Sequence, residues 1–487
     1  MSEQPNIIFI LPDQLRRDFL GCYGANFIHT PHIDSLAAGG VKYERAISQF
    51  PICVPARAAL LTGLGAPETG VVDNGKWLRP DRREMGIQTW PELLGQNGYH
   101  TASIGKMHFV PWDADEGFKE RITSEDKRHY WIQDDYADSL SDQGLSKSHG
   151  REFEGYAEQK GACINPNTEG MLPDRWVADR TIEFFDRQDP CRPFAAMIGF
   201  PSPHCPYDPA QEWLDAIDIK NLPRPLPETE GSRAQREAMI ANFKQDWADV
   251  DYSDLTKKQI MVLRQHYAAL IEAVDREVGR ILKALKTHDF ARNTIVIFAS
   301  DHGDFIGDFR LIGKGSFYAP AINIPLIIND MRCENDAKSE TAPVSLTDVF
   351  ATLLDFAGVN LPPEKIRFPS LVGQLDPNRR IFGLCPRGTM LVGPDFKFCR
   401  RITGEAEAYD LEIDPNEQFD LVADSSGDPR VAEYDTELTR HLMEGLSQAH
   451  NDKSYIESKS ADTNAFGRRK WKRPYPQPIS HERIRNI

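Results

Sequence analysis

Short, fully apolar runs alternate with longer amphipathic stretches along the first three quarters of the chain. Runs of this kind are typical of strands buried on both faces of a parallel sheet. The predicted strands are Asn6–Leu11, Tyr99–Ile104, Pro193–Phe200, Thr294–Ala299 and the shorter Ile324–Ile328. Helical spacing of apolar positions predicts helices over Met85–Gln96, Asp174–Arg187, Lys258–Lys286 and Val344–Ala357. This alternation indicates an α/β fold with a large, mostly parallel sheet sandwiched by helices.

The pattern changes after about residue 375, where the apolar segments become shorter. Strands are predicted over Ile381–Leu384, Phe396–Arg401 and Ala408–Leu411, and a helix near Tyr434–Gln448. We therefore expect a large domain over residues 1–375 and a small α+β domain over 376–451, followed by a polar and basic tail over 452–487. Residues 111–173 are poor in periodicity and rich in aromatic and turn residues. They favour a binding insertion within the large domain, with plain surface decoration as the alternative.

Composition and charge exclude several kinds of partner. The formal net charge of −16 argues against binding to nucleic acid or to an anionic membrane surface. No apolar run approaches membrane-spanning length, and the start of the chain lacks the features of a secretion signal. Eight scattered cysteines without a Cys-x-x-Cys pair favour a reducing cytoplasm. Because the chain is acidic, an anionic substrate would need a locally positive pocket.

Acidic residues follow two of the predicted strands. Asp13-Gln14 comes after the first strand, and Asp301-His302 comes directly after Thr294–Ala299. Open α/β sheets hold their ligands at the carboxyl ends of the strands, so these groups are candidates for one site. A turn or helix-capping role for Asp13 is the alternative.

Basic residues follow other strands in the same way. Lys106 and His108 come after Tyr99–Ile104, and in an extended segment residues two apart point into the same pocket. His204 stands between prolines, which fix its backbone and suit an acid or base. Lys314 is flanked by glycines, which permit close backbone approach. A solvated lysine and hydrogen-bonded structural histidines are the alternatives.

A short helix is predicted from Cys53, with Pro55 near its start and Gly63 just past its end. Cys53 would lie at the amino end, where free N–H groups and the helix dipole favour an anion. Arg57 would share its face, four residues on. A nucleophile beside a fixed guanidinium suits the cleavage of sulfate or phosphate esters.

The Cys-x-Pro-x-Arg sequence at Cys53–Arg57 resembles the signature of the formylglycine-dependent sulfatases, a branch of the alkaline-phosphatase superfamily. The other positions that match this family are Asp13, Gln14, Asn74, Lys106, His108, His204, Asp301, His302, Lys314, Tyr409-Asp410-Leu411 and Asp414-Pro415-Asn416-Glu417. The resemblance covers nearly the whole chain. The pairs Asp13-Gln14 and Asp301-His302 are most similar to those of choline sulfatases and phosphonate monoester hydrolases.

The resemblance implies hydrolysis of small sulfate monoesters by formylglycine derived from Cys53, which a formylglycine-generating enzyme would produce. It makes residues 1–375 the catalytic domain and 111–173 its substrate-shaping part. The implied ligands of one divalent cation, calcium or alternatively manganese, are Asp13, Gln14, Cys53, Asp301 and His302. The implied catalytic residues are Cys53, Arg57, Lys106, His108, His204 and Lys314, with Asn74 binding substrate. A homo-oligomer, dimer or tetramer, is also expected, because the basic tail over 452–487 suggests contacts between subunits.

Three alternatives remain at this stage. A phosphonate monoester or phosphodiester hydrolase would use the same nucleophile, although Lys106 and His108 favour sulfate; promiscuity between these esters is also expected. A catalytically inactive, metal-binding member would act as a scaffold. A cysteine hydrolase would use unmodified Cys53, but the spacing shows no Cys–His pair. The sequence does not specify the alcohol portion of the substrate.

Overall fold

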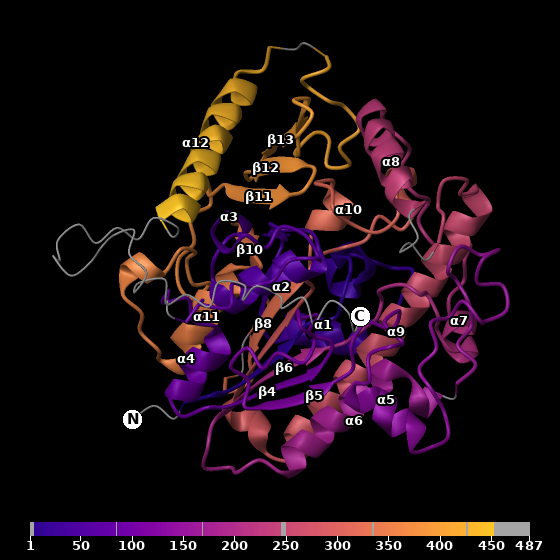
Figure 1. The fold of residues 1–487 in the computed structure, drawn as a ribbon, viewed down its shortest axis with the longest axis vertical. Helices are drawn as coiled ribbons and strands as arrows, with labels where there is room; N and C mark the ends of the chain where they lie inside the picture. The colour runs from indigo at the N-terminus through magenta and orange to yellow at the C-terminus, as the bar shows by residue number, and fades with distance from the viewer. Residues whose placement is uncertain are drawn as a thin grey trace, which may run out of the picture.

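The computed structural model describes residues 4–83, 85–167, 169–244, 250–333, 336–424 and 427–451. Its main feature is an eight-stranded sheet with the strand order β5-β4-β6-β1-β7-β8-β2-β9 (Figure 1). These strands are β1 (Asn6–Ile10), β2 (Val41–Tyr43), β4 (His100–Gly105), β5 (Glu120–Thr123), β6 (Phe194–Gly199), β7 (Thr294–Ala299), β8 (Leu326–Asp330) and β9 (Lys338–Glu340). Only the pairs β7–β8 and β8–β2 are antiparallel. The predicted mostly parallel sheet is confirmed.

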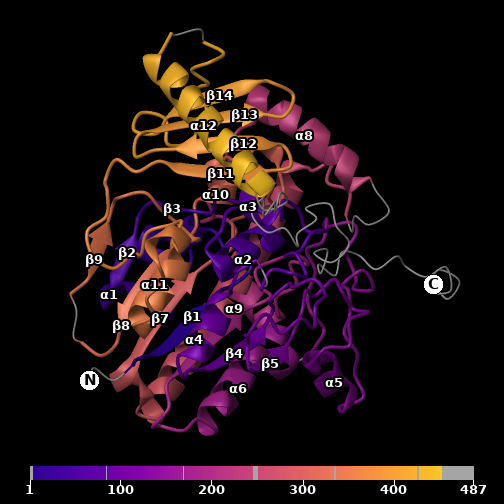
Figure 2. The same ribbon diagram turned by 60° about the vertical axis from the view of Figure 1, so that its left-hand side comes forward.

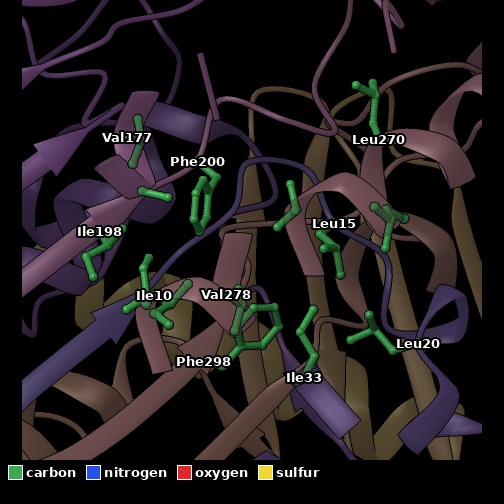
Figure 3. Close-up of a cluster of buried hydrophobic side chains, with 14 of the residues drawn as sticks. Ile10, Leu15, Leu20, Ile33, Val177, Ile198, Phe200, Leu270, Val278 and Phe298 are labelled. Carbon is green, nitrogen blue, oxygen red and sulfur yellow. The ribbon is translucent and has the colours of Figure 1, made fainter. Parts of the chain in front are cut away.

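Helices cover both faces of this sheet. The helices on one face are α1 (Pro31–Ala38), α6 (Pro173–Asp186) and α9 (Lys257–Thr287), and those on the other face are α2 (Cys53–Thr62), α4 (Trp90–Gln96) and α11 (Asp348–Ala357). Residues alternate between the two cores, as the pleat of a strand requires. In β1, Ile8 and Ile10 enter the first core, whereas Ile7 and Phe9 enter the second. Figure 3 shows Ile10 in the first core beside Val278 of α9.

A separate, four-stranded antiparallel sheet lies near the carboxyl end of the chain (Figure 2). Its strands are β11 (Ile381–Cys385), β12 (Gly388–Val392), β13 (Phe396–Arg401) and β14 (Ala406–Asp410). The long helix α12 (Pro429–Asn451) packs Tyr434 and Leu438 against Phe396 and Phe398 of this sheet. The α+β pattern is confirmed, and β12 is an additional strand. The predicted tail over 452–487 lies outside the described residues.

Two predicted helices begin later than their apolar pattern suggested. Helix α4 begins at Trp90 rather than Met85, because Thr89 forms a capping box with Glu92. Helix α11 begins at Asp348 rather than Val344, because β10 (Val344–Ser345) pairs with β3 (Ala46–Ile47). Other short helices are α3 (Ala66–Thr69), α5 (Asp135–Ser141), α7 (Gln211–Ala216), α8 (Glu230–Phe243) and α10 (Ala319–Ile322).

The segment 111–173 is not irregular throughout. Its strand β5 pairs in parallel with β4 and forms one edge of the large sheet. Four residues at an edge are too few to give a clear periodic pattern, so the sequence concealed this strand. Within the part of the chain that the structure describes, no helix has the length and apolar character needed to cross a membrane.

Candidate active site

The carboxyl ends of the central strands bring the predicted acidic groups together. Asp13 follows β1, and Asp301 follows the adjacent β7. The main-chain nitrogen of Gln14 donates to Asp301 Oδ1 at 3.0 Å, with Gln14 in a left-handed conformation at φ 71°. Both carboxylates are completely buried. Strand order therefore places the two acids at one point, as the sequence predicted.

Cys53 is the first residue of α2, which is buried along its whole length and ends at Gly63 with φ 64°. Its Sγ lies 3.1 Å from His302 Nε2 and 3.7 Å from Asp13 Oδ1. Burial raises the pKa of the thiol, but Lys314, His302 and hydrogen bonds with His108 and His204 outweigh burial and bring it well below its ordinary value. The spacing along the chain showed no Cys–His pair, but His302 reaches Cys53 from the end of β7, as expected if both residues hold one cation.

Arg57 lies one helical turn after Cys53 and joins three segments. Its Nε donates to Asp301 Oδ2 at 2.9 Å, and its Nη1 donates to the Lys106 carbonyl at 2.8 Å. Its Nη2 lies 3.6 Å from Asp13 Oδ2. The guanidinium is completely buried, so its charge is compensated only by these neighbouring groups.

Lys106 follows β4 and is also fully buried. Its Nζ lies 2.6 Å from Asp13 Oδ2 and 2.8 Å from Asp126 Oδ2. Burial lowers the pKa of this ammonium group, but Asp126 and Asp13 raise it more, so the net shift is upward. Lys106 is therefore a permanent positive charge beside the cysteine, which excludes the solvated-lysine alternative.

The backbone conformation that brings His108 to the site differs from the extended one that was predicted. Its backbone is left-handed, with φ 56°, rather than extended. Glu125 holds this conformation, since its carboxylate accepts from the main-chain nitrogens of His108 at 3.0 Å and Met107 at 3.3 Å. The His108 side chain nevertheless lies near enough to Cys53 to help lower the pKa of its thiol. The predicted proximity is correct, and the strand-alternation argument for it is wrong.

His204 and Lys314 form a hydrogen-bonded pair on another side of the site. Lys314 Nζ lies 2.7 Å from His204 Nε2 and also donates to Gln14 Oε1. His204 Nδ1 lies 2.7 Å from the carbonyl oxygen of Cys205. Burial, Lys314 and Lys106 lower the pKa of His204 to about 3, so its ring is neutral at neutral pH. Nδ1 therefore carries the ring proton, and Nε2 accepts from the ammonium.

The loop that carries Lys314 is supported by the small antiparallel sheet. Gly313 and Gly315 have φ of 79° and 85°, values that favour glycine on both sides of the lysine. The Gly315 carbonyl accepts from Arg387 Nη1 at 3.2 Å and from Cys385 Sγ at 3.6 Å. The β11–β12 hairpin therefore fixes the position of the lysine.

Asn74 occupies a different position from the other predicted residues. Its side chain is exposed, and its Oδ1 accepts from the main-chain nitrogen of Val54 at 3.1 Å. This is the geometry of a cap on the amino end of α2, supplied by a distant residue. Asn74 therefore supports the turn that presents Cys53.

Two acidic residues of this site were not predicted. Glu125 and Asp126 lie just beyond the end of β5, and both are buried. Asp126 also accepts from Arg128 Nη2 at 3.0 Å. The strand-end argument that identified Asp13 would have identified them, had the short strand β5 been recognised.

The residues present fit a divalent cation. Ligand atoms of Asp13, Cys53, Asp301 and His302 all lie within 4.8 Å of one another and are buried. Burial and the nearby Asp13 raise the pKa of Asp301, so additional positive charge at this point would favour its ionised form. Carboxylate oxygens suit a hard cation, and the imidazole also suits manganese. The fifth predicted ligand, the Gln14 side chain, donates a hydrogen bond to Asp304 and accepts one from Lys314.

The chain was compared with known proteins. The sulfatase family model matches residues 5–359. An arylsulfatase of Clostridium perfringens is 28% identical over 486 residues, covering 92% of this chain and 96% of that protein. A choline-sulfatase of Rhizobium meliloti is 27% identical over 381 residues, covering 75% of this chain and 69% of that protein.

A solved structure shows the same fold. The phosphonate monoester hydrolase of Agrobacterium radiobacter superposes with a TM-score of 0.76 at 22% identity, covering 92% of this chain and 96% of that one. At this identity the likeness supports the fold alone. The family model matches well over half of the chain and includes the complete strand-end site. The chain belongs to the sulfatase family, and its activity is the hydrolysis of sulfate esters.

Proposed function

We propose that this chain hydrolyses sulfate monoesters with formylglycine made from Cys53 and with one bound divalent cation. The observation that carries the proposal is the position of Cys53. Its buried Sγ lies 3.1 Å from His302 Nε2 at the amino end of α2. The cations Arg57, Lys106 and Lys314 are part of the same contact network. This arrangement supplies the positive pocket that an acidic protein needs for an anionic substrate.

The proposed cation is held by Asp13, Asp301, His302 and the modified Cys53, with the side-chain oxygen of Gln14 as a further ligand. Calcium is the proposed ion and manganese the alternative. When bound, the cation supplies Lewis acidity toward sulfate oxygen and balances the two buried carboxylates. Both carboxylates already face positive groups in the protein, which is consistent with a site built for opposite charge.

Modification of Cys53 explains how the enzyme turns over. A hydrated aldehyde carries two hydroxyl groups on one carbon. One oxygen attacks sulfur, and the bond from sulfur to the departing alcohol breaks. The second hydroxyl then loses its proton to His108, the aldehyde re-forms, and sulfate leaves. His108 lies near Cys53 and contributes to the lowered pKa of its thiol, a position that suits this role. A formylglycine-generating enzyme is the proposed maturation partner.

Lys106, Arg57 and Lys314 stabilise the charge that develops on the equatorial sulfate oxygens. Fixed charges in a buried site need little reorganisation during the reaction. Lys106 is held by two carboxylates and Arg57 by Asp301 and a carbonyl. Their side chains are therefore oriented before substrate arrives.

The His204–Lys314 pair supplies the proton for the departing alkoxide. Because His204 Nε2 accepts from Lys314, the mobile proton of the pair resides on the ammonium group. The neutral ring of His204 is oriented by the Cys205 carbonyl. The pair thus delivers one proton to the leaving group without a charged histidine in the resting site.

A substrate panel tests this proposal. Protein whose Cys53 peptide has the lower mass of formylglycine is assayed with an aryl sulfate, choline sulfate and a phenylphosphonate ester. We expect kcat/KM for a sulfate ester to exceed that for the phosphonate. Faster phosphonate cleavage would instead favour the phosphonate hydrolase alternative, and loss of all activity in modified, metal-loaded protein would favour the scaffold alternative.

A cytoplasmic location and a homo-oligomeric state remain proposals. All eight cysteines are free thiols in the structure, which supports a reducing compartment. The basic tail that suggested subunit contacts lies outside the described residues. Sedimentation of the full chain, with and without residues 452–487, tests the oligomer.

A further inference from the structure

A row of ring contacts leads from the reaction centre to the protein surface. The ring centroids of His108 and His129 are 5.8 Å apart, and those of His129 and Trp131 are 5.0 Å apart. Tyr130 meets Trp131 edge-on at 5.3 Å. His108 is 8% exposed, whereas Trp131 is 67% exposed and Tyr130 is 55% exposed. The row therefore connects a buried catalytic histidine to an open aromatic surface.

The loop with these rings is fixed to the sulfate pocket by Asp126. Asp126 Oδ2 contacts the Lys106 ammonium at 2.8 Å, while Oδ1 accepts from Arg128 main-chain nitrogen at 2.9 Å. The Asp126 carbonyl accepts from His129 nitrogen at 2.9 Å, and the His129 carbonyl accepts from Ile132 nitrogen at 3.0 Å. Two successive turns thus hold the rings at a set position relative to Lys106.

Tyr130 and Trp131 pack against each other and both remain exposed, and an exposed cluster of large aromatic side chains is typical of a binding surface. The His129 ring packs against the Trp131 ring at an inclination of 37°, and the two form an aromatic wall whose outer member, Trp131, is 67% exposed. Such a wall complements the face of another ring. Aromatic faces also bind quaternary ammonium groups, but the Arg128 guanidinium stands next to His129 in the same turn and would repel such a cation beside these rings.

We propose that His129 and Trp131 form the leaving-group subsite, a stacking wall for a flat ring in the alcohol portion of the sulfate ester. The inference rests on the proposed function and specifies its substrate class, an aryl or pyranose alcohol. The sulfate group occupies the pocket of Lys106 and Arg57. The ring lies against Trp131 where the alcohol leaves the site.

The variant Trp131→Ala tests this wall, with Trp131→Phe to retain a ring. Phe419→Ala is the matched control, because Phe419 is 75% exposed and belongs to no part of the site. The substrates are 4-nitrophenyl sulfate, glucosamine 6-sulfate and choline sulfate, with inorganic sulfate as inhibitor. For Trp131→Ala we expect kcat/KM for one or both ring substrates to fall about tenfold, mainly through KM. Choline sulfate turnover and sulfate inhibition should change less than about twofold.

A loss confined to the aryl or to the sugar substrate supports the subsite and identifies its ring. Unchanged kinetics with both ring substrates would overturn the proposal. An equal loss with choline sulfate, or weaker sulfate inhibition, would overturn it as well, because either result indicates a general structural role. Calorimetric binding of 4-nitrophenyl sulfate to Cys53→Ala, with and without Trp131→Ala, separates the subsite from turnover. Weaker binding of 4-nitrophenyl sulfate to the double variant supports the subsite. This comparison needs no enzyme activity, so it holds even if the proposed function fails.

Discussion

The site has two halves that are built differently. The half around Cys53, Asp13, Asp301 and His302 is wholly buried and is set by strand ends and a helix end. The half around Arg128, His129 and Trp131 lies on a loop and reaches 67% exposure. Regular buried elements hold atoms closely in place, whereas loops tolerate change. The chemistry common to all sulfate esters therefore lies in the first half and the selection of the alcohol in the second.

Removal of divalent cations should have the largest effect if the buried half is a metal site. We expect a chelator to lower kcat by about two orders of magnitude or more, because the two acids lose their counter-charge and sulfate loses its Lewis acid. Dialysis against calcium or manganese should restore activity, and the better ion identifies the cofactor. Full activity at a metal content verified as negligible would contradict the assignment.

Replacement of Arg57 tests how strongly the buried half depends on its internal charges. In metal-free protein, Arg57→Met leaves Asp301 without its 2.9 Å partner. We expect the free energy of unfolding to fall by about 3–5 kcal/mol in denaturant titrations. The control is Arg332→Ala, whose partly exposed pair with Asp330 should contribute less than about 1 kcal/mol. Equal losses in both variants would remove the distinction between buried and exposed pairs.

Asp126 joins the two halves, so its replacement should affect catalysis more than folding. Asp126→Asn removes the charge that pairs with the Lys106 ammonium group and weakens the hydrogen bond with the Arg128 main-chain nitrogen. We expect kcat/KM to fall about 10–100-fold, with weaker sulfate inhibition and partial recovery in Asp126→Glu. Exposed Asp138→Asn, nearby on α5, is the control and should leave both values unchanged. Normal sulfate inhibition in Asp126→Asn would show that Lys106 needs no such support.

Asn74 gives the smallest expected effect. As a cap on α2, Asn74→Ala should cost about 1 kcal/mol of stability, and Asn74→Asp should retain most of it. If Asn74 instead binds substrate, as the family resemblance implied, kcat/KM will fall steeply while the melting temperature stays constant. Calorimetric unfolding and steady-state kinetics on the two variants distinguish these roles.

The buried half could be predicted from the sequence because it obeys rules of regular structure. Apolar runs located β1 and β7, and the acids at their ends were then forced to one edge of the sheet. The two ends of α2 were marked by Pro55 and Gly63. These signals are local, and burial on both faces makes them strong.

The half of the site on the loop after β5 could not be predicted from the sequence, and the reasons are physical. Strand β5 is a four-residue edge strand, so Glu125 and Asp126 carried no strand-end signal. The left-handed backbone of His108 depends on Glu125, a contact between residues 17 positions apart. The pairing of Cys53 with His302 spans 249 positions and follows from sheet order alone. Such contacts become visible only when the strands are arranged in space.

The fate of Cys53→Ser tests the central claim most directly. A serine can form the bond to sulfur but has no second hydroxyl to expel sulfate. Incubated with 4-nitrophenyl sulfate, metal-loaded Cys53→Ser should release at most one equivalent of nitrophenol per chain, and mass analysis should find sulfate esterified to residue 53. Sustained turnover by this variant, with no adduct on that peptide, would contradict the proposed mechanism.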